Sequence, residues 1–301
     1  MSGTVRTIRH AARPTSVAGW LARNRFALAR RAVQFGVLLL FFGTAHRGWT
    51  IAGRPLLQGN LAAASFAGIV PLADPFATLQ ILATGHLMRS EVWIGAVIVF
   101  AAWLLLGGRT FCAWVCPLDV VTDAAAWLRE RLGLRDLLHI PSTTRYGVLA
   151  LAIVLSALTG VAAFEWVSPI GMLHRALVYG TLGGLVAVAG VLLLDLAVLR
   201  RGWCGHLCPL GAFWSLAGRA GLVKVHFDDA RCTRCGDCVK ACPEPRVLNL
   251  NRAAERGVID GGECTNCGRC VAICPEDSLA FRIRPLTRVP VSPPPSRGFP
   301  S

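Results

Sequence analysis

Long apolar stretches separated by basic segments are the main pattern along this chain. Residues 92–108 and 146–164 contain no charged side chain, and each is long enough to cross a hydrocarbon core about 30 Å thick. Residues 176–199 are longer and carry one acid, Asp195, close enough to the end to reach the interface. Gly180 and Gly184 form a G-x-x-x-G step there, which favours close approach of another helix.

The earliest apolar stretch is the weakest of four candidate membrane spans. Residues 32–45 are short for a span unless the helix continues through Arg47 to Ile51. A signal peptide is the alternative, because Arg30 and Arg31 precede the apolar core, but no A-x-A cleavage site follows. We therefore expect four transmembrane helices.

Arginine predicts the orientation of these spans, because short loops rich in Lys and Arg stay in the cytoplasm. Residues 1–31 contain seven arginines and no acid, and further arginines follow the second and fourth spans. Residues 52–91 carry few bases, against Asp74 and Glu91. Both termini are therefore expected on the cytoplasmic side of a bacterial inner membrane.

Composition agrees with a membrane protein, since 54% of residues are hydrophobic and 16% are charged. The net charge of +14 does not indicate nucleic-acid binding, because residues 222–284 are nearly balanced and the surplus lies in the arm, the membrane-flanking segments and the tail. Such charge suits anionic lipids of the inner leaflet. No C-x-x-C-H or P-loop motif is present, so covalent haem and nucleotide binding have no support.

The segment between the first two spans, residues 52–91, is unusually apolar for a loop. Pro71 and Pro75 interrupt it, and residues 77–87 are expected to form a helix in the interface. This helix is either a packing element over the bundle or one wall of a quinone pocket.

Eight of the twelve cysteines form two C-x2-C-x2-C-x3-C-P runs, the bacterial ferredoxin signature for two [4Fe–4S] clusters. In this signature the fourth cysteine of each run ligates the other cluster. Zinc sites and disulfides do not require this spacing twice. The predicted ligands are Cys232, Cys235, Cys238 and Cys274 for cluster one, and Cys264, Cys267, Cys270 and Cys242 for cluster two.

The other four cysteines form two C-x3-C-P pairs, each just after the predicted cytoplasmic end of a span. If the second and fourth helices are neighbours, Cys112, Cys116, Cys204 and Cys208 meet at the membrane surface. They would then suffice for an additional metal, cluster or redox-disulfide site. The alternative is inert buried cysteines, because free Cys is common in protein cores.

A quinol-oxidising site needs a proton acceptor beside an apolar slot. Glu165 and His174 bracket the short turn between the third and fourth spans, and Asp74 lies in the apolar outer segment. We select these three as the candidate quinol site, although interfacial acids and histidines often have only structural roles.

Together these features predict an α-helical membrane protein of four transmembrane helices with a C-terminal α+β double-cluster ferredoxin domain. The expected parts are a basic cytoplasmic arm (1–31), the membrane domain with both C-x3-C-P motifs (32–221), the 2[4Fe–4S] domain (222–284) and a disordered tail (285–301).

The segments FCAWVCPLDVVTD, WCGHLCPLGAFW and VSPIGMLHR, with the double ferredoxin run, resemble the NapH family over roughly residues 30–284. The resemblance implies a membrane subunit of a quinol dehydrogenase that takes electrons from ubiquinol or menaquinol. It also implies a periplasmic ferredoxin-type partner, NapG-like, and a periplasmic nitrate reductase as acceptor. Related membrane ferredoxins leave open an assembly or redox-maintenance role for another enzyme, such as nitrous oxide reductase.

Overall fold

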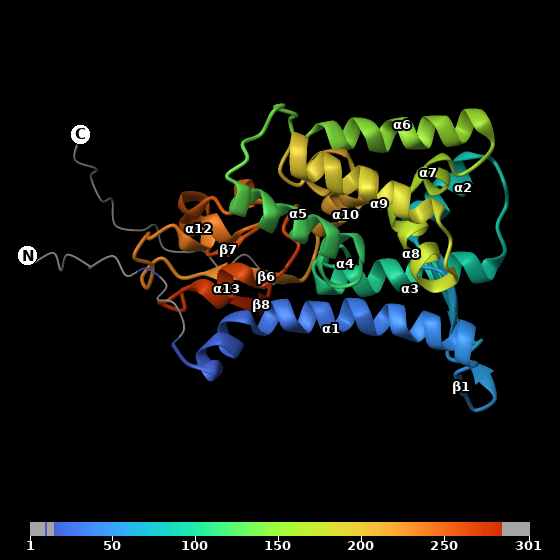
Figure 1. Cartoon of the computed structure of the whole chain (residues 1–301), viewed down its shortest axis with the longest axis horizontal. Helices are drawn as coiled ribbons and strands as arrows, with labels where there is room; N and C mark the ends of the chain where they lie inside the picture. The colour runs from blue at the N-terminus through green and yellow to red at the C-terminus, as the bar shows by residue number, and fades with distance from the viewer. Residues whose placement is uncertain (1–9, 11–14, 285–301) are drawn as a thin grey trace, which may run out of the picture.

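The computed structural model describes residue 10 and residues 15–284. The remainder of the basic arm and the tail 285–301 lie outside the described residues, so the predicted disorder of the tail is not addressed. The described chain has a helical part, residues 17–218, and a small α+β part that follows it. These two parts lie toward opposite ends of the long axis (Figure 1).

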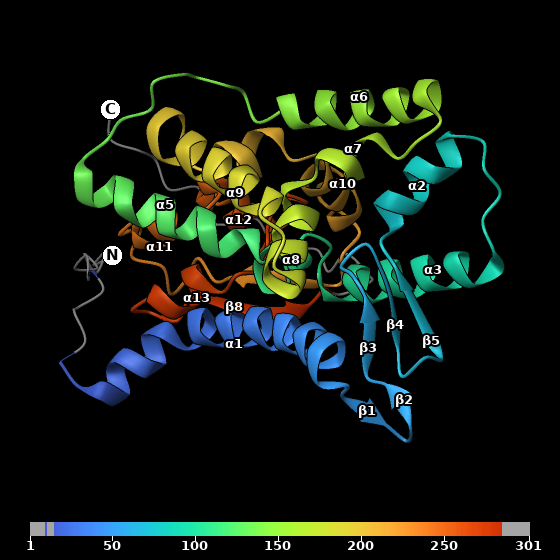
Figure 2. The ribbon, with the colours of Figure 1, turned by 45° about the vertical axis from the view of Figure 1, so that its right-hand side comes forward.

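The longest helix is α1 (Val17–Arg47); Ser16 caps its start by accepting a hydrogen bond from the Gly19 amide, and Gly48 caps its end in the left-handed conformation. It runs beside the α+β part and then along the helical part, as both views show (Figures 1 and 2). The remaining helical elements of this part are α2 (Pro75–Ala83), α3 (Ser90–Leu106), α4 (Thr110–Trp114), α5 (Leu118–Leu132), α6 (Thr144–Thr159), α7 (Ala163–Val167), α8 (Pro169–Tyr179), α9 (Gly183–Leu193), η1 (Leu194–Val198), η2 (Trp203–Leu207) and α10 (Pro209–Gly218).

Among the described residues, α1 (Val17–Arg47) is the one helix long and apolar enough to cross a membrane. The other three predicted spans appear as shorter apolar helices, Ser90–Leu106, Thr144–Thr159 and Gly183–Val198. The first apolar stretch, which was the weakest candidate span in the sequence, thus belongs to the longest helix. This helix is long because it continues on its N-terminal side through polar residues. The four-span arrangement stays a prediction.

The fourth predicted span is not one continuous helix, which corrects the expectation for residues 176–199. Helix α8 ends at Tyr179, Gly180 adopts a left-handed conformation (φ 70°), and the chain turns before α9 begins at Gly183. Gly184 then packs α9 against α8, since an added Cβ would lie 2.2 Å from the Met172 carbonyl oxygen. Gly180 and Gly184 therefore allow the turn and the close packing of a helical hairpin, and they do not lie on one face of a single span.

The outer segment contains strands that the sequence analysis missed. The strands β1 (Thr50–Ile51) and β2 (Arg54–Pro55) form one antiparallel pair, and β3 (Leu57–Gly59), β4 (Ala63–Phe66) and β5 (Val70–Ala73) form a three-stranded sheet. Helix α2 starts at Pro75 and stops at Ala83, earlier than the predicted 77–87, because Asp74 caps its first turn and Gly85 follows with φ 80°. It packs against α3 and α6.

The C-terminal part has an antiparallel sheet in the order β7-β6-β8, formed by Val258–Ile259, Val223–Phe227 and Leu279–Ile283. Its helices are α11 (Asp237–Ala241), η3 (Pro245–Val247), α12 (Leu250–Arg256) and α13 (Arg269–Ile273). The core packs Val225, Phe227, Ile259 and Leu279 with the cysteines of both runs. This is the α+β ferredoxin domain that the sequence predicted.

The α8–α9 hairpin provides a test of the fold. We expect Gly184→Ala to lower the free energy of unfolding by about 1–3 kcal/mol, because overpacking displaces the backbone of α8. Gly190→Ala, on the same helix with nothing near its added Cβ, is the matched control and should be neutral or slightly stabilising. Thermal unfolding of both variants in detergent measures the difference, and equal melting temperatures would contradict the close α8–α9 packing.

Candidate functional site: three groups of cysteines

The eight ferredoxin cysteines line two separate cavities. Cys232, Cys235, Cys238 and Cys274 line the first cavity, of about 320 Å³, and Cys242, Cys264, Cys267 and Cys270 line the second cavity, of about 400 Å³. Each cavity therefore combines three cysteines of one run with the last cysteine of the other. This grouping has the crossed pattern of a bacterial two-cluster ferredoxin.

The surroundings of these thiols suit iron–sulfur clusters. Burial raises the pKa of Cys242 to about 12 and of Cys264 to about 11, so these thiols stay protonated unless a metal stabilises the thiolate. Backbone amides also reach the sulfurs, since the Arg234 amide lies 3.4 Å from Cys232 Sγ. In the described residues no group of His, Cys, Asp and Glu is arranged to hold a single metal ion.

The two C-x3-C-P pairs come together next to the ferredoxin domain. We call Cys112, Cys116, Cys204 and Cys208 the thiol quartet. Cys116 lies within electrostatic reach of Cys112 and Cys208, and Cys204 lies within reach of Cys208 and Cys116. Burial raises the pKa of all four thiols.

Two members of the quartet lie at helix starts, whereas Cys112 lies within α4 and Cys204 within η2. Cys116 directly precedes Pro117 and α5, and Cys208 precedes Pro209 and caps α10, where its sulfur accepts a hydrogen bond from the Gly211 amide at 3.4 Å. The first residues of a helix have no hydrogen-bond partner for their backbone N–H groups, so proline, which lacks this group, is well tolerated there. Each Cys-Pro step therefore marks the point at which one segment ends and the next helix begins. Gln34 of α1 donates to the carbonyls of Ala113 and Cys116 and so holds the first motif against α1.

Arg109 joins the thiol quartet to the second cavity. Its side chain is 2% exposed, and it donates to the Cys204 carbonyl at 2.8 Å, the Glu244 carboxylate at 3.0 Å and the Glu263 carbonyl at 3.2 Å. Burial alone would lower the Arg109 pKa, but Glu244 and the nearby thiols Cys112 and Cys204 raise it, so the guanidinium stays charged. Glu244 lies two residues after Cys242, a member of the second cavity.

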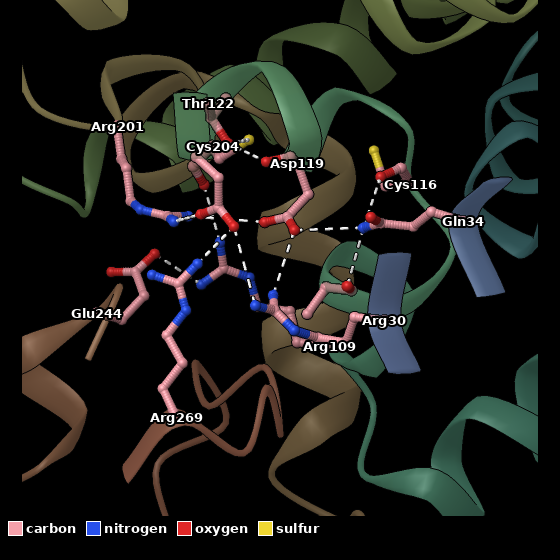
Figure 3. A network of polar contacts seen from close by, with 12 residues as sticks. Arg30, Gln34, Arg109, Cys116, Asp119, Thr122, Arg201, Cys204, Glu244 and Arg269 are labelled. Carbon is pink, nitrogen blue, oxygen red and sulfur yellow. Dashed lines mark hydrogen bonds and ion pairs between the residues drawn. The ribbon is translucent and has the colours of Figure 1, made fainter. Parts of the chain in front are cut away.

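A second charged network surrounds Asp119 and Asp123 of α5, and Figure 3 shows Asp119 among arginine side chains of this network. Asp119 accepts from Arg30 at 3.3 Å and Arg31 at 3.2 Å, both on α1. Asp123 pairs with arginines from three parts of the chain, namely Arg31, Arg201 and Arg269. Burial alone would raise the Asp123 pKa, but these guanidinium groups hold it below the usual value. The network ties α1, α5, the second motif and the ferredoxin domain together.

The predicted quinol residues are only partly brought together. Asp74 caps α2 and lies near Glu165 of α7, and burial followed by the Glu165 charge raises the Asp74 pKa to about 7. Burial also raises the pKa of Glu165, which is hydrogen-bonded to Gln80 of α2. His174 is fully buried, lies 4.7 Å from the Phe41 ring of α1, and has no hydrogen-bond partner on either nitrogen.

Several residues of these sites were missed by the sequence analysis. Arg109 and Asp119 are adjacent to the first C-x3-C-P motif, and this proximity was the available signal. Gln80, a polar residue in a mostly apolar helix, was a similar signal on the outer side. Asn266 donates to the Leu106 and Val223 carbonyls and links the second run to α3, but its position inside the run gave no indication of this role.

Comparison with known proteins places these sites in a family. A 4Fe-4S dicluster domain model matches residues 224–275, and a 4Fe-4S binding domain model matches residues 91–135 and 180–227, once around each C-x3-C-P pair. The methylamine utilization ferredoxin-type protein MauN of Methylorubrum extorquens is 42% identical, covering 79% of this chain and 82% of its own length. No solved structure matches the chain.

The ferredoxin-type protein NapH of Escherichia coli is also 42% identical, covering 76% of this chain and 79% of its own length. NapH of Haemophilus influenzae is 41% identical with the same coverage. The chain therefore belongs to the family of iron–sulfur, ferredoxin-type proteins that includes NapH and MauN, and the resemblance seen in the sequence is confirmed.

The acidic network provides a test of how the domains are joined. We expect Asp123→Asn to lower the free energy of unfolding by about 3–5 kcal/mol, because it leaves several guanidinium groups without their partner. Glu130→Gln removes the exposed ion pair with Arg200 and should cost less than about 1 kcal/mol. Thermal unfolding followed by cluster absorbance compares them. Equal stability of the two variants would contradict a joining role.

Proposed function

We propose that this chain is the membrane electron-transfer subunit of a quinol dehydrogenase in the bacterial inner membrane, with several spans and both termini in the cytoplasm. The observation that carries the proposal is the spatial order of three neighbouring cysteine groups. The thiol quartet comes first, the cysteines of the second cavity come next, and those of the first cavity come last. A single buried side chain, Arg109, contacts both the segment that bears Cys204 and the residue that follows the Cys242–Pro243 step. Such proximity suits stepwise electron transfer.

Each ferredoxin cavity would hold one [4Fe–4S] cluster, with the ligands Cys232, Cys235, Cys238 and Cys274 in the first and Cys242, Cys264, Cys267 and Cys270 in the second. The lining of the two cavities supports this assignment. A bound cluster supplies a one-electron centre whose potential depends on nearby charge and solvent exposure. Arg109 would place a fixed positive charge beside the second cavity. The thiol quartet is a further redox site in this proposal; its four thiols are not arranged to hold a single metal ion in the described residues.

Cys242 provides a test of the crossed ligation, in which the last cysteine of one run ligates the cluster of the other run. We expect Cys242→Ser to reduce the iron content and to alter the spin-resonance signal of the cluster bound by Cys264, Cys267 and Cys270, although Cys242 belongs to the other run. Glu255→Gln, an exposed acid of α12 that lines neither cavity, is the control and should retain full iron content. Unchanged iron in Cys242→Ser would refute crossed ligation.

Asp74, Glu165 and His174 are the proposed residues of the quinol site. Asp74 and Glu165 form a half-buried carboxyl pair whose raised pKa values suit acceptance of quinol protons near neutral pH. His174 is buried without partners and so has free nitrogens for a ligand hydroxyl or proton. His174 packs against Phe41 of α1, whereas Gln80 of α2 is hydrogen-bonded to the Phe164 amide and to Glu165, so His174 and the carboxyl pair have different neighbours.

Quinol chemistry at this pair gives a pH-dependent prediction. A general base must be deprotonated, so we expect quinol-dependent cluster reduction to rise with pH through about 7, the value for Asp74. Glu165→Gln and His174→Ala should lower the rate by about 10²-fold with iron content unchanged. Glu91→Gln, an exposed acid at the start of α3, is the control. Rates measured with a quinol analogue in isolated membranes test this.

Unchanged affinity and turnover in both variants would move the quinol site to the thiol quartet near His206. No quinol-dependent reduction in the unaltered protein would instead favour the second candidate, an assembly or redox-maintenance protein. One observation supports that candidate, because MauN relatives named for methylamine utilization are as similar as NapH. A family whose members are named for both methylamine utilization and NapH is consistent with a redox-maintenance role that is not specific to one enzyme.

The proposed route ends at a periplasmic, NapG-like ferredoxin partner and a periplasmic nitrate reductase. The outer carboxyl pair and the ferredoxin cysteines lie toward opposite ends of the molecule, as the positions of α2 and α7 relative to α13 show (Figure 1). Electrons therefore either cross the helical part or pass directly from the quinol site to the periplasmic partner.

A further inference from the structure

Lys224 of β6 is a buried cation without a carboxylate partner in the described part of the chain. It is 2% exposed, and its ammonium group donates a hydrogen bond to the Gly218 carbonyl at the end of α10. Asp260 lies within electrostatic reach of Lys224 but forms its ion pair with Arg256. A charge is seldom buried unless an opposite charge compensates it, so the partner of this ammonium group has to be sought.

The neighbours of Lys224 along β6 place it beside the second cavity. The Val223 carbonyl accepts a hydrogen bond from the Asn266 side chain at 3.0 Å, and Asn266 lies two residues after Cys264. Val225, on the other side of Lys224, lines the second cavity itself. The strand that carries the ammonium group is thus attached to the run whose cysteines form this cavity.

The contacts of Gly218 lead to the same cysteine run. A Cβ added at Gly218 would lie 2.6 Å from the Gly262 carbonyl, and Gly262 stands two residues before Cys264. Burial lowers the Lys224 pKa from its ordinary value, and the Cys264 sulfur opposes this change more than any other group does. The strongest electrostatic attraction on the ammonium group therefore comes from a cysteine of the second cavity.

The arginines near this cavity already have carboxylate partners. Arg109 lies within electrostatic reach of Cys264, and Arg30 and Arg201 lie within reach of Cys267. Each of them forms an ion pair, namely with Glu244 for Arg109, Asp119 for Arg30 and Asp123 for Arg201. Their charges are thus compensated within the chain, whereas the charge of Lys224 is not.

Lysine is also rare in this chain, since only Lys224 and Lys240 among its 31 basic residues are lysines. An ammonium group is a compact point charge, whereas a guanidinium group is planar and larger. A small buried site beside a cluster favours the former. Lys240 is exposed on α11 and provides a matched control in the same domain.

We propose that Lys224 is the counter-charge of the cluster in the second cavity and raises the reduction potential of that cluster. A [4Fe–4S] cluster with four thiolate ligands has a net negative charge, which becomes more negative when the cluster accepts an electron. A positive charge nearby favours this more negative, reduced state. Reduction adds one electron and breaks no bond. The proposal rests on the proposed function only for the presence of this cluster.

Lys224→Gln tests the proposal, because glutamine can still donate to the Gly218 carbonyl but has no charge. The full chain in detergent is titrated with dithionite and redox mediators, and the two clusters are followed by spin resonance. The signal altered in Cys264→Ser identifies the second cluster, because Cys264 lines the second cavity. At the potential where the second cluster of the unaltered protein is half reduced, we expect Lys224→Gln to lower its ratio of reduced to oxidised form at least threefold. This corresponds to about 28 mV for a one-electron couple.

Lys240→Gln is the control and should change the same ratio by less than about 1.5-fold, because water screens its exposed charge. A merely structural role for Lys224 predicts lower thermal stability of Lys224→Gln without a selective change in potential. A decrease of less than threefold in the second cluster, or an equal decrease in both clusters, would overturn the proposal.

Lys224→Arg covers the case in which Lys224→Gln fails to assemble its clusters, because arginine keeps the positive charge. We expect its second cluster to remain within threefold of the unaltered ratio, and a larger decrease would overturn the proposal. The titration requires no quinol. Absence of quinol oxidation would therefore contradict only the proposed function, whereas an unchanged potential in Lys224→Gln would contradict only the role of Lys224.

Discussion

The burial of Asp119 and Asp123 among arginines is the interaction on which the rest of the structure depends. Taking carboxylates and guanidinium groups out of water costs several kcal/mol per ion, and the cost is offset only when all partners are in place. The partners come from α1, from the second C-x3-C-P motif and from the ferredoxin domain. Because α5 starts at the residue after Pro117, the same helix that carries the two acids also fixes Cys116.

Local spacing explains what the sequence predicted well. Three of the cysteine ligands of each cluster lie within a few residues of each other, so the two runs and their α+β domain could be predicted from the sequence alone. The apolar stretches also correspond to helices α1, α3, α6 and α9. The strands between residues 50 and 73 were not predicted, because they are short and their apolar residues do not alternate over a useful length. The turn at Gly180 looked like helix packing for a similar reason, since glycine occurs in both settings.

Contacts between distant segments were beyond sequence reasoning. Arg109 stood beside a recognised motif, but its partner Glu244 lies in the other domain. Asp123 likewise has its arginines far along the chain in both directions. A charge next to a motif is visible in a sequence, whereas the choice of its partner depends on the packed arrangement. The candidate quinol residues show the same limit, since Asp74 and Glu165 meet while His174 packs against α1.

Two copies of one motif have taken different roles at the domain boundary. Arg109 and Arg201 each stand three residues before the first cysteine of a C-x3-C-P pair, yet Arg109 reaches Glu244 and Arg201 reaches Asp123. The position after Leu118 holds Asp119, while the equivalent position after Leu210 is Gly211, where an added Cβ would lie 3.5 Å from the Arg109 guanidinium. The acid in one copy pairs with Arg201 at 3.7 Å, whereas the glycine in the other copy lies within van der Waals distance of Arg109. Both arginines then act next to the second cavity, because Asp123 is shared with Arg269 and Glu244 follows Cys242. The duplicated motif thus concentrates positive charge on the covered side of the ferredoxin domain and leaves the first half free of such contacts in the described part of the chain.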